Sequence, residues 1–268
     1  MPAGRFYVAG ATLATGVEID LPGEIAHQAR DVLRLAKGEA IRLLDGKGGE
    51  YPARLTEVSR ARVRIIPGER MVGAAEPPAR LTLYQGMLKA AKFEWVLQKG
   101  TELGVGAFVP VISSRAVAAT EAMGAAKRQR YERILIEAME QCGGTYLPTL
   151  AAPLALERAL IEATAHHAAT LIPWEGEPSL TVRAGLRQAL ASHTSDLPAI
   201  ALFIGPEGGF SADEIALARS YGALPVTLGR RILRAETAAL VAVALALDAL
   251  LEYTCFSGQN PTTHHVPL

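Results

Sequence analysis

Residues 203–210 read Phe-Ile-Gly-Pro-Glu-Gly-Gly-Phe, and this stretch decides how the second half of the chain folds. The apolar run 200–204 stops at Gly205, and Ser211 and Glu214 then have the spacing of a helix capping box. Strand, tight glycine loop and capped helix together are typical of an open α/β sheet that presents backbone N–H groups to a ligand. A turn with a purely structural role is the alternative for a single glycine loop.

A second loop, residues 228–238, reads Leu-Gly-Arg-Arg-Ile-Leu-Arg-Ala-Glu-Thr-Ala and leads into an Ala/Leu-rich helix. Ile232 and Leu233 stand between arginines, so we expect part of this loop to be buried. An arginine held beside an apolar wall can bind an oxyanion or a phosphate with two hydrogen bonds, whereas a solvated basic loop is the alternative. We expect the two loops to follow adjacent strands and to hold one ligand between them.

The known nucleotide-binding motifs are absent from both loops. The sequence contains no G-x-x-x-x-G-K-[ST] motif, and no G-x-G-x-x-G motif follows a strand. The loop 205–209 contains no lysine and carries Glu207, which would repel a polyphosphate. The first loop therefore suits a neutral or cationic ligand, and a phosphotransferase is the weakest of the alternatives.

Two patterns of secondary structure divide the chain. Residues 1–72 contain short apolar runs separated by glycine turns, which predicts a small β-barrel. The prolines of 73–78 indicate a linker. Residues 79–256 alternate strand and helix patterns, which predicts an α/β domain with a mostly parallel sheet covered on both faces, and the polar tail 257–268 is predicted to be flexible.

Arg60, Arg62 and Arg64 alternate with apolar residues in the first domain. On a strand over 60–66 the three side chains would form one row, because alternate residues share a face. Such a row could bind a phosphate backbone, and a solvated strand face is the alternative.

Composition sets limits on partners and location. Lys+Arg and Asp+Glu balance at 27 each, so attraction to nucleic acid requires a local patch. The 2 cysteines and scattered histidines have no metal-ligand spacing, and no metal site is expected. The sequence also shows no signal-peptide core and no apolar run long enough to cross a bilayer, so we expect a cytoplasmic protein without membrane contact.

Taken together, the motifs 203–214 and 228–238 resemble those of the 16S ribosomal RNA (uracil-N3) methyltransferase family of the knotted SPOUT superfamily. Further matches extend through 98–105, 114–115 and 140–143, and weaker ones in the first domain through 5–8, His27 and 32–34. The sequence departs from the family pattern at Gly144, where an arginine is usual. The resemblance implies a PUA-like barrel followed by a SPOUT methyltransferase domain with a trefoil knot.

The resemblance also implies a function. Such an enzyme transfers a methyl group from S-adenosylmethionine to N3 of a uridine in 16S rRNA of the small ribosomal subunit, usually as a homodimer. Residues expected to bind the cofactor are Leu171, Pro173, Ile204, Gly205, Pro206, Glu207, Gly208, Gly209, Leu228, Gly229, Ile232, Leu233, Thr237 and Ala238. Residues expected to contact RNA are Arg5, Arg34, Arg60, Arg62 and Arg64.

Two residues are candidates for catalysis. Arg234 is expected to stabilise negative charge on the uracil oxygens, and Glu236 to act as base toward N3. A carboxylate that only stabilises the start of a helix is the alternative for Glu236. Other SPOUT enzymes, which methylate a ribose 2′-hydroxyl or another base, and a ribosome-associated RNA-binding protein without catalysis remain alternative functions.

Overall fold

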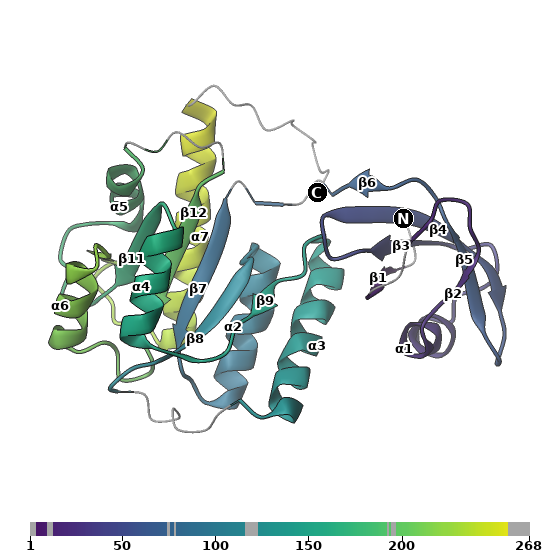
Figure 1. The fold of residues 1–268 in the computed structure, drawn as a ribbon, viewed down its shortest axis with the longest axis horizontal. Helices are drawn as coiled ribbons and strands as arrows, with labels where there is room; N and C mark the ends of the chain where they lie inside the picture. The colour runs from purple at the N-terminus through teal and green to yellow at the C-terminus, as the bar shows by residue number, and fades with distance from the viewer. Residues whose placement is uncertain are drawn as a thin grey trace. The chain divides into compact units, whose positions relative to one another are not determined.

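The computed structural model describes two compact units (Figure 1). One comprises Met1–Glu76 with Ile136–Leu147, and the other Pro77–Leu135 with Pro148–Leu268. The described residues are 4–9, 13–73, 76–77, 79–115, 123–191, 193 and 197–256. The predicted tail 257–268 lies outside them.

The N-terminal unit is built on a six-stranded sheet with the order β1-β3-β4-β5-β2, and β6 pairs with β4. Only β1 and β3 run parallel; the other pairs are antiparallel. Alternation of apolar and polar residues buries one face of β4 and β5 against a core that includes Phe6, Leu43 and Ile65. The strands are β1 (Arg5–Tyr7), β2 (Ile19–Asp20), β3 (Ala40–Leu44), β4 (Gly49–Val58), β5 (Val63–Pro67) and β6 (Met71–Val72).

The prediction that Arg60, Arg62 and Arg64 form a row on one strand is wrong. Strand β5 begins at Val63, so Arg64 alone of the three lies on it. Arg60 and Arg62 belong to the turn between β4 and β5, where the backbone N–H of Ser59 donates to the carbonyl of Arg62 at 2.9 Å. The tight turn interrupts the extended backbone, and the three side chains therefore do not share a strand face.

A short helical segment connects β2 to β3. Helix α1 (Gly23–His27) continues into the π-helical turn η1 (Gln28–Val32), and Ala26 and Ala29 pack into the core. Arg34 ends this segment with φ of 53°, while the N–H of Leu35 donates to the carbonyl of Ala29 at 2.9 Å. A left-handed residue that ends a helical segment in this way is usually glycine.

The second unit contains a seven-stranded sheet in which every pair is parallel, as the sequence predicted. Its order is β10-β8-β7-β12-β11-β13, and β9 pairs with β8. The strands are β7 (Arg80–Gly86), β8 (Ala107–Ile112), β9 (Thr149–Leu150), β10 (Leu154–Ala155), β11 (Ala169–Pro173), β12 (Ala199–Ile204) and β13 (Leu224–Val226).

Helices cover both faces of this sheet (Figure 1). Helices α4 and α6 pack over one face, where Phe203 stacks on Tyr84 with ring centroids 4.4 Å apart. Helices α2 and α7 pack against each other, and α5 packs against α7 and β11. The helices are α2 (Ala90–Leu103), α3 (Ala125–Cys142), α4 (Leu156–His166), α5 (Val182–Ala189), α6 (Ala212–Ser220) and α7 (Ala235–Phe256).

The expected strand, loop and capped helix are present at 199–220. Strand β12 ends at Ile204, and Ser211 caps α6 with the complete reciprocal capping box to Glu214. The second Glu214 oxygen accepts from the backbone N–H of Ser114 at 2.7 Å, which fixes the start of α6 to the end of β8. The glycine loop is therefore held between two anchored elements.

The last turns of α3 belong to the N-terminal unit, which the sequence did not reveal. Glu140 accepts a 2.6 Å hydrogen bond from the backbone N–H of Tyr7. Thr145 donates to the carboxylate of Glu76 from both its backbone and its hydroxyl, each at 2.7 Å. Burial of Glu140 raises its pKa, although the hydrogen bond from Tyr7 opposes this shift.

Candidate active site

Three loops, not two, meet at the carboxyl edge of the parallel sheet. The expectation that the two sequence motifs follow adjacent strands is wrong, because β11 lies between β12 and β13. The loop that follows β11 thus stands between the two motifs. The carboxyl edge of an open parallel sheet is where α/β proteins bind ligands. A pocket of about 650 Å³ lies here, lined by Pro173, Trp174, Glu175, Glu177, Pro178, Thr227, Leu228, Gly229, Arg230, Arg231, Ile232, Leu233 and Ala238.

The pocket contains some of the residues predicted to bind a cofactor. Those that line it are Pro173, Leu228, Gly229, Ile232, Leu233 and Ala238. The predicted residues outside the lining are Leu171, Ile204, Gly205, Pro206, Glu207, Gly208, Gly209 and Thr237. Leu171 is buried in the core beneath Gly185, so its side chain has a packing role. The glycine loop borders the pocket, since a Cβ on Gly209 would lie 3.7 Å from Oε1 of Glu175.

The segment Trp174–Pro178 was missed by sequence reasoning. Only its position after a buried strand could have drawn attention to it, because its residue types carry no known motif. It brings two carboxylates, Glu175 and Glu177, to the pocket wall. Backbone N–H groups of Leu180 and Ser179 lower the pKa of Glu177, which also lies 3.9 Å from Arg219, so this carboxylate is ionised near neutral pH.

Close packing fixes the path of the glycine loop. A Cβ on Gly86 would lie 2.5 Å from the backbone nitrogen of Pro206, so no larger residue fits there without displacing the loop. The buried side chain of Gln85 donates to the carbonyl of Gly205 at 3.4 Å, and Arg115 donates to that of Gly208 at 3.2 Å. The backbone of the loop is thus held in place by the ends of β7 and β8.

The loop that contains Arg230, Arg231 and Arg234, called the arginine loop below, is less buried than the sequence predicted. Ile232 was expected to be part of a buried wall, but its side chain is 90 % exposed, and Leu233 is half-buried. The loop leaves the sheet after β13 without a regular element, and nothing else in the described chain covers Ile232. Arg230, Arg231 and Arg234 are exposed and have no acidic partner among the residues that the structure describes. These guanidinium groups are consequently available to an anionic ligand.

A small charge cluster lies at the start of α7. The Lys92 ammonium is 3.4 Å from a Glu207 oxygen and 3.6 Å from Oε2 of Glu236. Burial alone would raise the pKa of Glu207, but its own backbone N–H and Lys92 outweigh burial and lower it. Oε2 of Glu236 is buried and accepts no hydrogen bond. A buried acceptor without a hydrogen-bond donor costs about 1–3 kcal/mol, and the Lys92 ammonium 3.6 Å away offsets part of that cost.

In the N-terminal unit, most of the predicted RNA contacts are occupied by carboxylates. Arg62 pairs with Glu57 at 2.8 Å. Arg64 pairs with Glu18 at 2.5 Å and Arg5 with Glu50 at 3.7 Å. Arg5 also lies beside Gly143, where an added Cβ would be 3.3 Å from its guanidinium carbon. Such pairing leaves these three arginines less available to phosphate.

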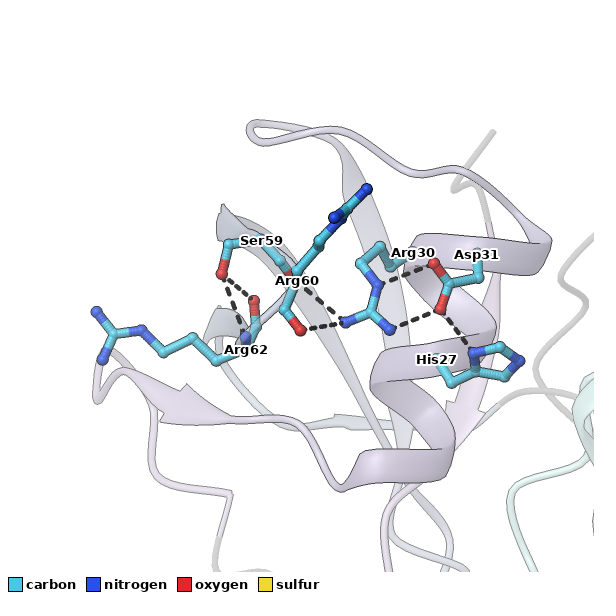
Figure 2. Close-up of polar contacts among 6 residues, drawn as sticks. All are labelled: His27, Arg30, Asp31, Ser59, Arg60 and Arg62. Carbon is cyan, nitrogen blue, oxygen red and sulfur yellow. Dashed lines mark hydrogen bonds and ion pairs between the residues drawn. The ribbon is translucent and has the colours of Figure 1, made fainter.

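Arg60 is the exception in this turn (Figure 2). Its side chain is exposed and, within the described residues, has no carboxylate partner. The backbone carbonyls of Ser59 and Arg60 each accept from Arg30 at 3.2 Å, and Arg30 is in turn held by Asp31 at 2.6 Å. Figure 2 shows the Arg60 and Arg62 side chains extending in different directions from the turn. Arg30 therefore anchors the turn that presents Arg60.

Arg34 is also exposed and lacks an acidic partner in the described part of the chain. It is the one non-glycine residue with positive φ among the described residues. A left-handed conformation costs an ordinary residue about 1–2 kcal/mol. Because the left-handed position favours glycine, this arginine is a candidate for a functional role of its side chain.

Two further observations concern the described residues only. They contain no group of three or more His, Cys, Asp or Glu residues arranged to hold a metal ion. None of the helices among them combines the length and apolar character needed to cross a membrane.

An all-parallel α/β unit with a glycine loop and a basic loop at its carboxyl edge follows a small β unit in this chain, and both units match families of proteins that modify RNA. Residues 75–247 match the family model of the RNA methyltransferase domain, and residues 21–67 match that of the RNA methyltransferase PUA domain. The chain belongs to this RNA methyltransferase family, as its motifs indicated.

Several relatives carry a specific name. The chain is 37 % identical over 227 residues to ribosomal RNA small subunit methyltransferase E of Synechocystis, covering 84 % of this chain and 71 % of the relative. It is 30 % identical to the Bacillus subtilis protein of that name, covering 84 % and 87 %. It also resembles the crystal structure of the Neisseria gonorrhoeae protein of that name bound to S-adenosyl methionine, with a TM-score of 0.78, 34 % identity and coverage of 90 % and 95 %.

Proposed function

We propose that this chain transfers a methyl group from S-adenosylmethionine to N3 of a specific uridine in 16S rRNA of the small ribosomal subunit. The observation that carries the proposal is the pocket at the carboxyl edge of the sheet, in a chain whose relatives are ribosomal RNA methyltransferases. Its glycine and apolar lining suits a nucleoside, and Glu175 and Glu177 suit a cationic ligand.

The residues present fit S-adenosylmethionine. It would supply a methyl group on a sulfonium centre, whose positive charge the anionic wall of Glu175 and Glu177 favours. The close approach at Gly86 and Pro206, and the positive φ of Gly209 and Gly229, let the backbone lie near a ligand where larger residues would not fit. We assign cofactor binding to Pro173, Ile204, Gly205, Pro206, Glu207, Gly208, Gly209, Leu228, Gly229, Ile232, Leu233, Thr237 and Ala238, and leave Leu171 to the packing role that its burial indicates.

Two residues are assigned to the target base. Uridine N3 must lose its proton before it can act as a nucleophile, and the carboxylate of Glu236, whose Oε2 accepts no hydrogen bond and lies 3.6 Å from the Lys92 ammonium, is assigned as the acceptor of that proton. Arg234 has no acidic partner in the described residues, so its guanidinium can stabilise the negative charge that develops on the uracil oxygens. Positioning of the two groups would supply much of the acceleration.

The first domain, residues 1–72, is proposed to bind the rRNA. Arg34 and Arg60 are assigned the main phosphate contacts because neither has a carboxylate partner in the described chain. Arg5, Arg62 and Arg64 are assigned secondary contacts, since RNA must compete with Glu50, Glu57 and Glu18 for them. Residues 73–78 would link this domain to the catalytic domain 79–256.

We also propose that the chain works in the cytoplasm as a homodimer with a trefoil knot in its second unit. The 90 % exposure of Ile232 beside the pocket supports a second copy, because an aliphatic side chain so exposed gains about 1.5–3 kcal/mol when it is covered. A partner chain over the arginine loop would complete the pocket wall.

Mass spectrometry of ribosomal RNA from cells with and without the gene tests this function. Loss of a base-methylated uridine from 16S rRNA, restored by the wild-type gene, is expected. Loss of a ribose-methylated nucleotide would instead identify another SPOUT activity. Unchanged rRNA together with no calorimetric binding of S-adenosylmethionine would leave only an RNA-binding role and contradict the proposal.

A further inference from the structure

Tyr146 is an exposed aromatic residue at a closely packed place in the N-terminal unit. It follows the last turn of α3, in the segment Ile136–Leu147 that belongs to this unit. The residue is 56 % exposed, although its ring lies against the turn between β3 and β4. A Cβ on Gly48 of that turn would be 2.5 Å from Cζ and from the hydroxyl oxygen of the ring. One part of the ring therefore rests on a glycine, while the remainder faces solvent.

Backbone hydrogen bonds fix Tyr146 in place. The N–H of Gly48 donates to the carbonyl of Thr145 at 3.0 Å, and the N–H of Tyr146 donates to the carboxylate of Glu76 at 3.2 Å. Lys47 and Tyr146 also form an isolated antiparallel bridge. These contacts position the residue before any ligand arrives, which reduces the conformational entropy that is lost on binding.

The turn beneath the ring is held in one conformation by its own contacts. Oδ1 of Asp45 accepts from the backbone N–H of Lys47 at 2.7 Å and from that of Gly49 at 2.8 Å. Gly48 has φ of 88°, a left-handed value that residues with a side chain rarely adopt. Any side chain at this position would also displace the ring of Tyr146. The exposed ring and the turn below it therefore form one fixed surface.

Positive charge adjoins this surface. Lys47 precedes Gly48 in the turn, is exposed, and has no carboxylate partner among the residues that the structure describes. Arg70 donates to the carbonyl of Lys47 at 3.4 Å, and its Nε lies 3.3 Å from Oδ2 of Asp45. Its side chain is 45 % exposed, so part of the guanidinium remains open to a ligand.

Two further arginines lie at the beginning of the same loop. A Cβ on Gly143 would be 3.3 Å from the guanidinium carbon of Arg5, and Arg5 is the strand partner of Arg42. Both arginines contact one carboxylate, that of Glu50, at 3.7 Å and 3.0 Å. One carboxylate does not neutralise two guanidinium groups. An exposed aromatic ring among such cations is the arrangement that binds single-stranded nucleic acid, because bases stack on the ring and phosphates pair with the cations.

We propose that Tyr146 is a stacking platform for one unpaired base of RNA, and that Lys47 contacts an adjoining phosphate. This inference rests on the proposed function, in which the N-terminal unit binds rRNA, and it adds a base contact to the phosphate contacts. The bases of a duplex are stacked on one another, so the ring selects a single-stranded segment or a bulge. Every base has a π-face, so the contact tolerates different sequences.

Fluorescence anisotropy of labelled RNA tests the ring directly. The probes are a single-stranded oligoadenylate of about 12 nucleotides and a duplex of the same length. Tyr146→Leu should bind the single strand about 5- to 100-fold more weakly, because the π-face is lost, and should bind the duplex as the unaltered protein does. Tyr146→Phe keeps the ring and should bind both RNAs with unaltered affinity.

The dependence of affinity on salt separates the ring from its neighbouring cation. Tyr146→Leu should leave the slope of log affinity against log salt unchanged, because stacking releases no counterions. Lys47→Gln should reduce this slope by about 0.7 for the single strand, since one phosphate contact is lost. Tyr221→Leu is the control, because it removes a tyrosine of the second unit that is held by Glu157 at 2.9 Å, and it should change neither quantity.

Several results would overturn the inference. One is equal affinity of the unaltered protein and Tyr146→Leu for the single strand, together with a lower thermal midpoint, which would leave Tyr146 a packing role alone. An equal loss in Tyr146→Phe would assign the effect to the hydroxyl, and failure of the unaltered protein to bind the single strand would also contradict stacking. If Tyr146→Leu does not fold, Tyr146→Met removes the ring and keeps an apolar side chain. If rRNA methylation is unchanged without the gene, the proposed function fails, whereas these titrations still decide the role of Tyr146.

Discussion

Three arginines of the N-terminal unit and the three arginines of the loop after β13 are arranged in opposite ways. In the N-terminal unit Arg30, Arg62 and Arg64 are held by neighbouring carboxylates at 2.5–2.8 Å. In the loop after β13, Arg230, Arg231 and Arg234 have no acidic partner within the described residues. The first arrangement fixes the shape of a small domain, whereas the second leaves positive charge available at the edge of a pocket.

This difference indicates how to assign function among many arginines. A guanidinium already paired with a carboxylate must give up that partner before it can bind phosphate, and surface pairs contribute only about 0–1 kcal/mol. Unpaired arginines bind an anion without that exchange. By this criterion Arg34 and Arg60 are available to phosphate, as the arginines after β13 are, because neither has a carboxylate partner within the described residues.

The largest effect is expected at the unpaired arginine nearest the proposed base. Arg234→Ala should lower the methylation rate by about 10²–10³-fold, because a group that stabilises developing charge is lost. Its affinity for S-adenosylmethionine, measured by calorimetry, should stay within about twofold. Arg158→Ala, which removes an arginine paired with Glu162 on α4, is the control. Equal losses of rate and cofactor affinity would contradict the assignment.

A smaller effect separates Arg60 from Arg62 in the same turn. Arg60→Ala should weaken binding of rRNA several-fold and reduce the slope of log affinity against log salt by about 1, because one phosphate contact is lost. Arg62→Ala should change both quantities less, since Glu57 already holds that side chain. Fluorescence anisotropy over a series of salt concentrations measures both. Equal changes for the two variants would remove the distinction between paired and unpaired arginines.

One substitution of Arg34 is expected to raise the stability of the protein while it lowers the affinity for rRNA. Arg34→Gly should raise the free energy of unfolding by about 0.5–1 kcal/mol, because the left-handed strain is relieved at a smaller cost in chain entropy. The same variant should bind rRNA more weakly. In Arg34→Ala, binding should weaken to the same degree with no gain in stability, since the strain remains. Urea denaturation and anisotropy test the pair, and unchanged RNA binding in both would exclude Arg34 from the contact surface.

The smallest effect concerns the pair that anchors the turn. The hydrogen bond from Arg30 lowers the pKa of Asp31 to about 2, below its ordinary value near 3.8. Its contribution to stability is therefore fully present above pH 4 and is lost as the pH falls through about 2. Asp31→Asn should lower the thermal midpoint slightly at pH 5, with the difference closing at pH 2. A difference independent of pH would mean that the charge of Asp31 contributes nothing.

The sequence predicted most of the parallel sheet correctly. Strands β8, β11 and β12 lie within 79–256, the region for which the sequence predicted alternating strands and helices, and β12 ends at Ile204, where the apolar run 200–204 ends. Continuous apolar runs between helical patterns carry this information, because parallel strands are buried on both faces. The Ser211 and Glu214 capping box likewise follows from two residue types at one spacing.

Other features could not be read from local patterns. The arginine row failed because alternation alone does not distinguish a strand from the turn that precedes it at Ser59–Arg62. Strand order is a long-range property, so no local signal placed β11 between the two motifs. The position of Lys92 between two carboxylates depends on how α2 packs against α7, and its own sequence neighbours give no indication of it.

The first unit is built from two separate segments of the chain, Met1–Glu76 and Ile136–Leu147, so it cannot be isolated as one continuous fragment. A fragment ending at Glu76 would lose Glu140, the acceptor for Tyr7, and would also lose Thr145, a donor to Glu76. Grafting residues 1–76 alone onto another enzyme would therefore transplant an incomplete domain. The helix that begins in the catalytic unit and ends in the other makes the two parts inseparable by a single cut, so they are expected to be inherited, exchanged and lost together.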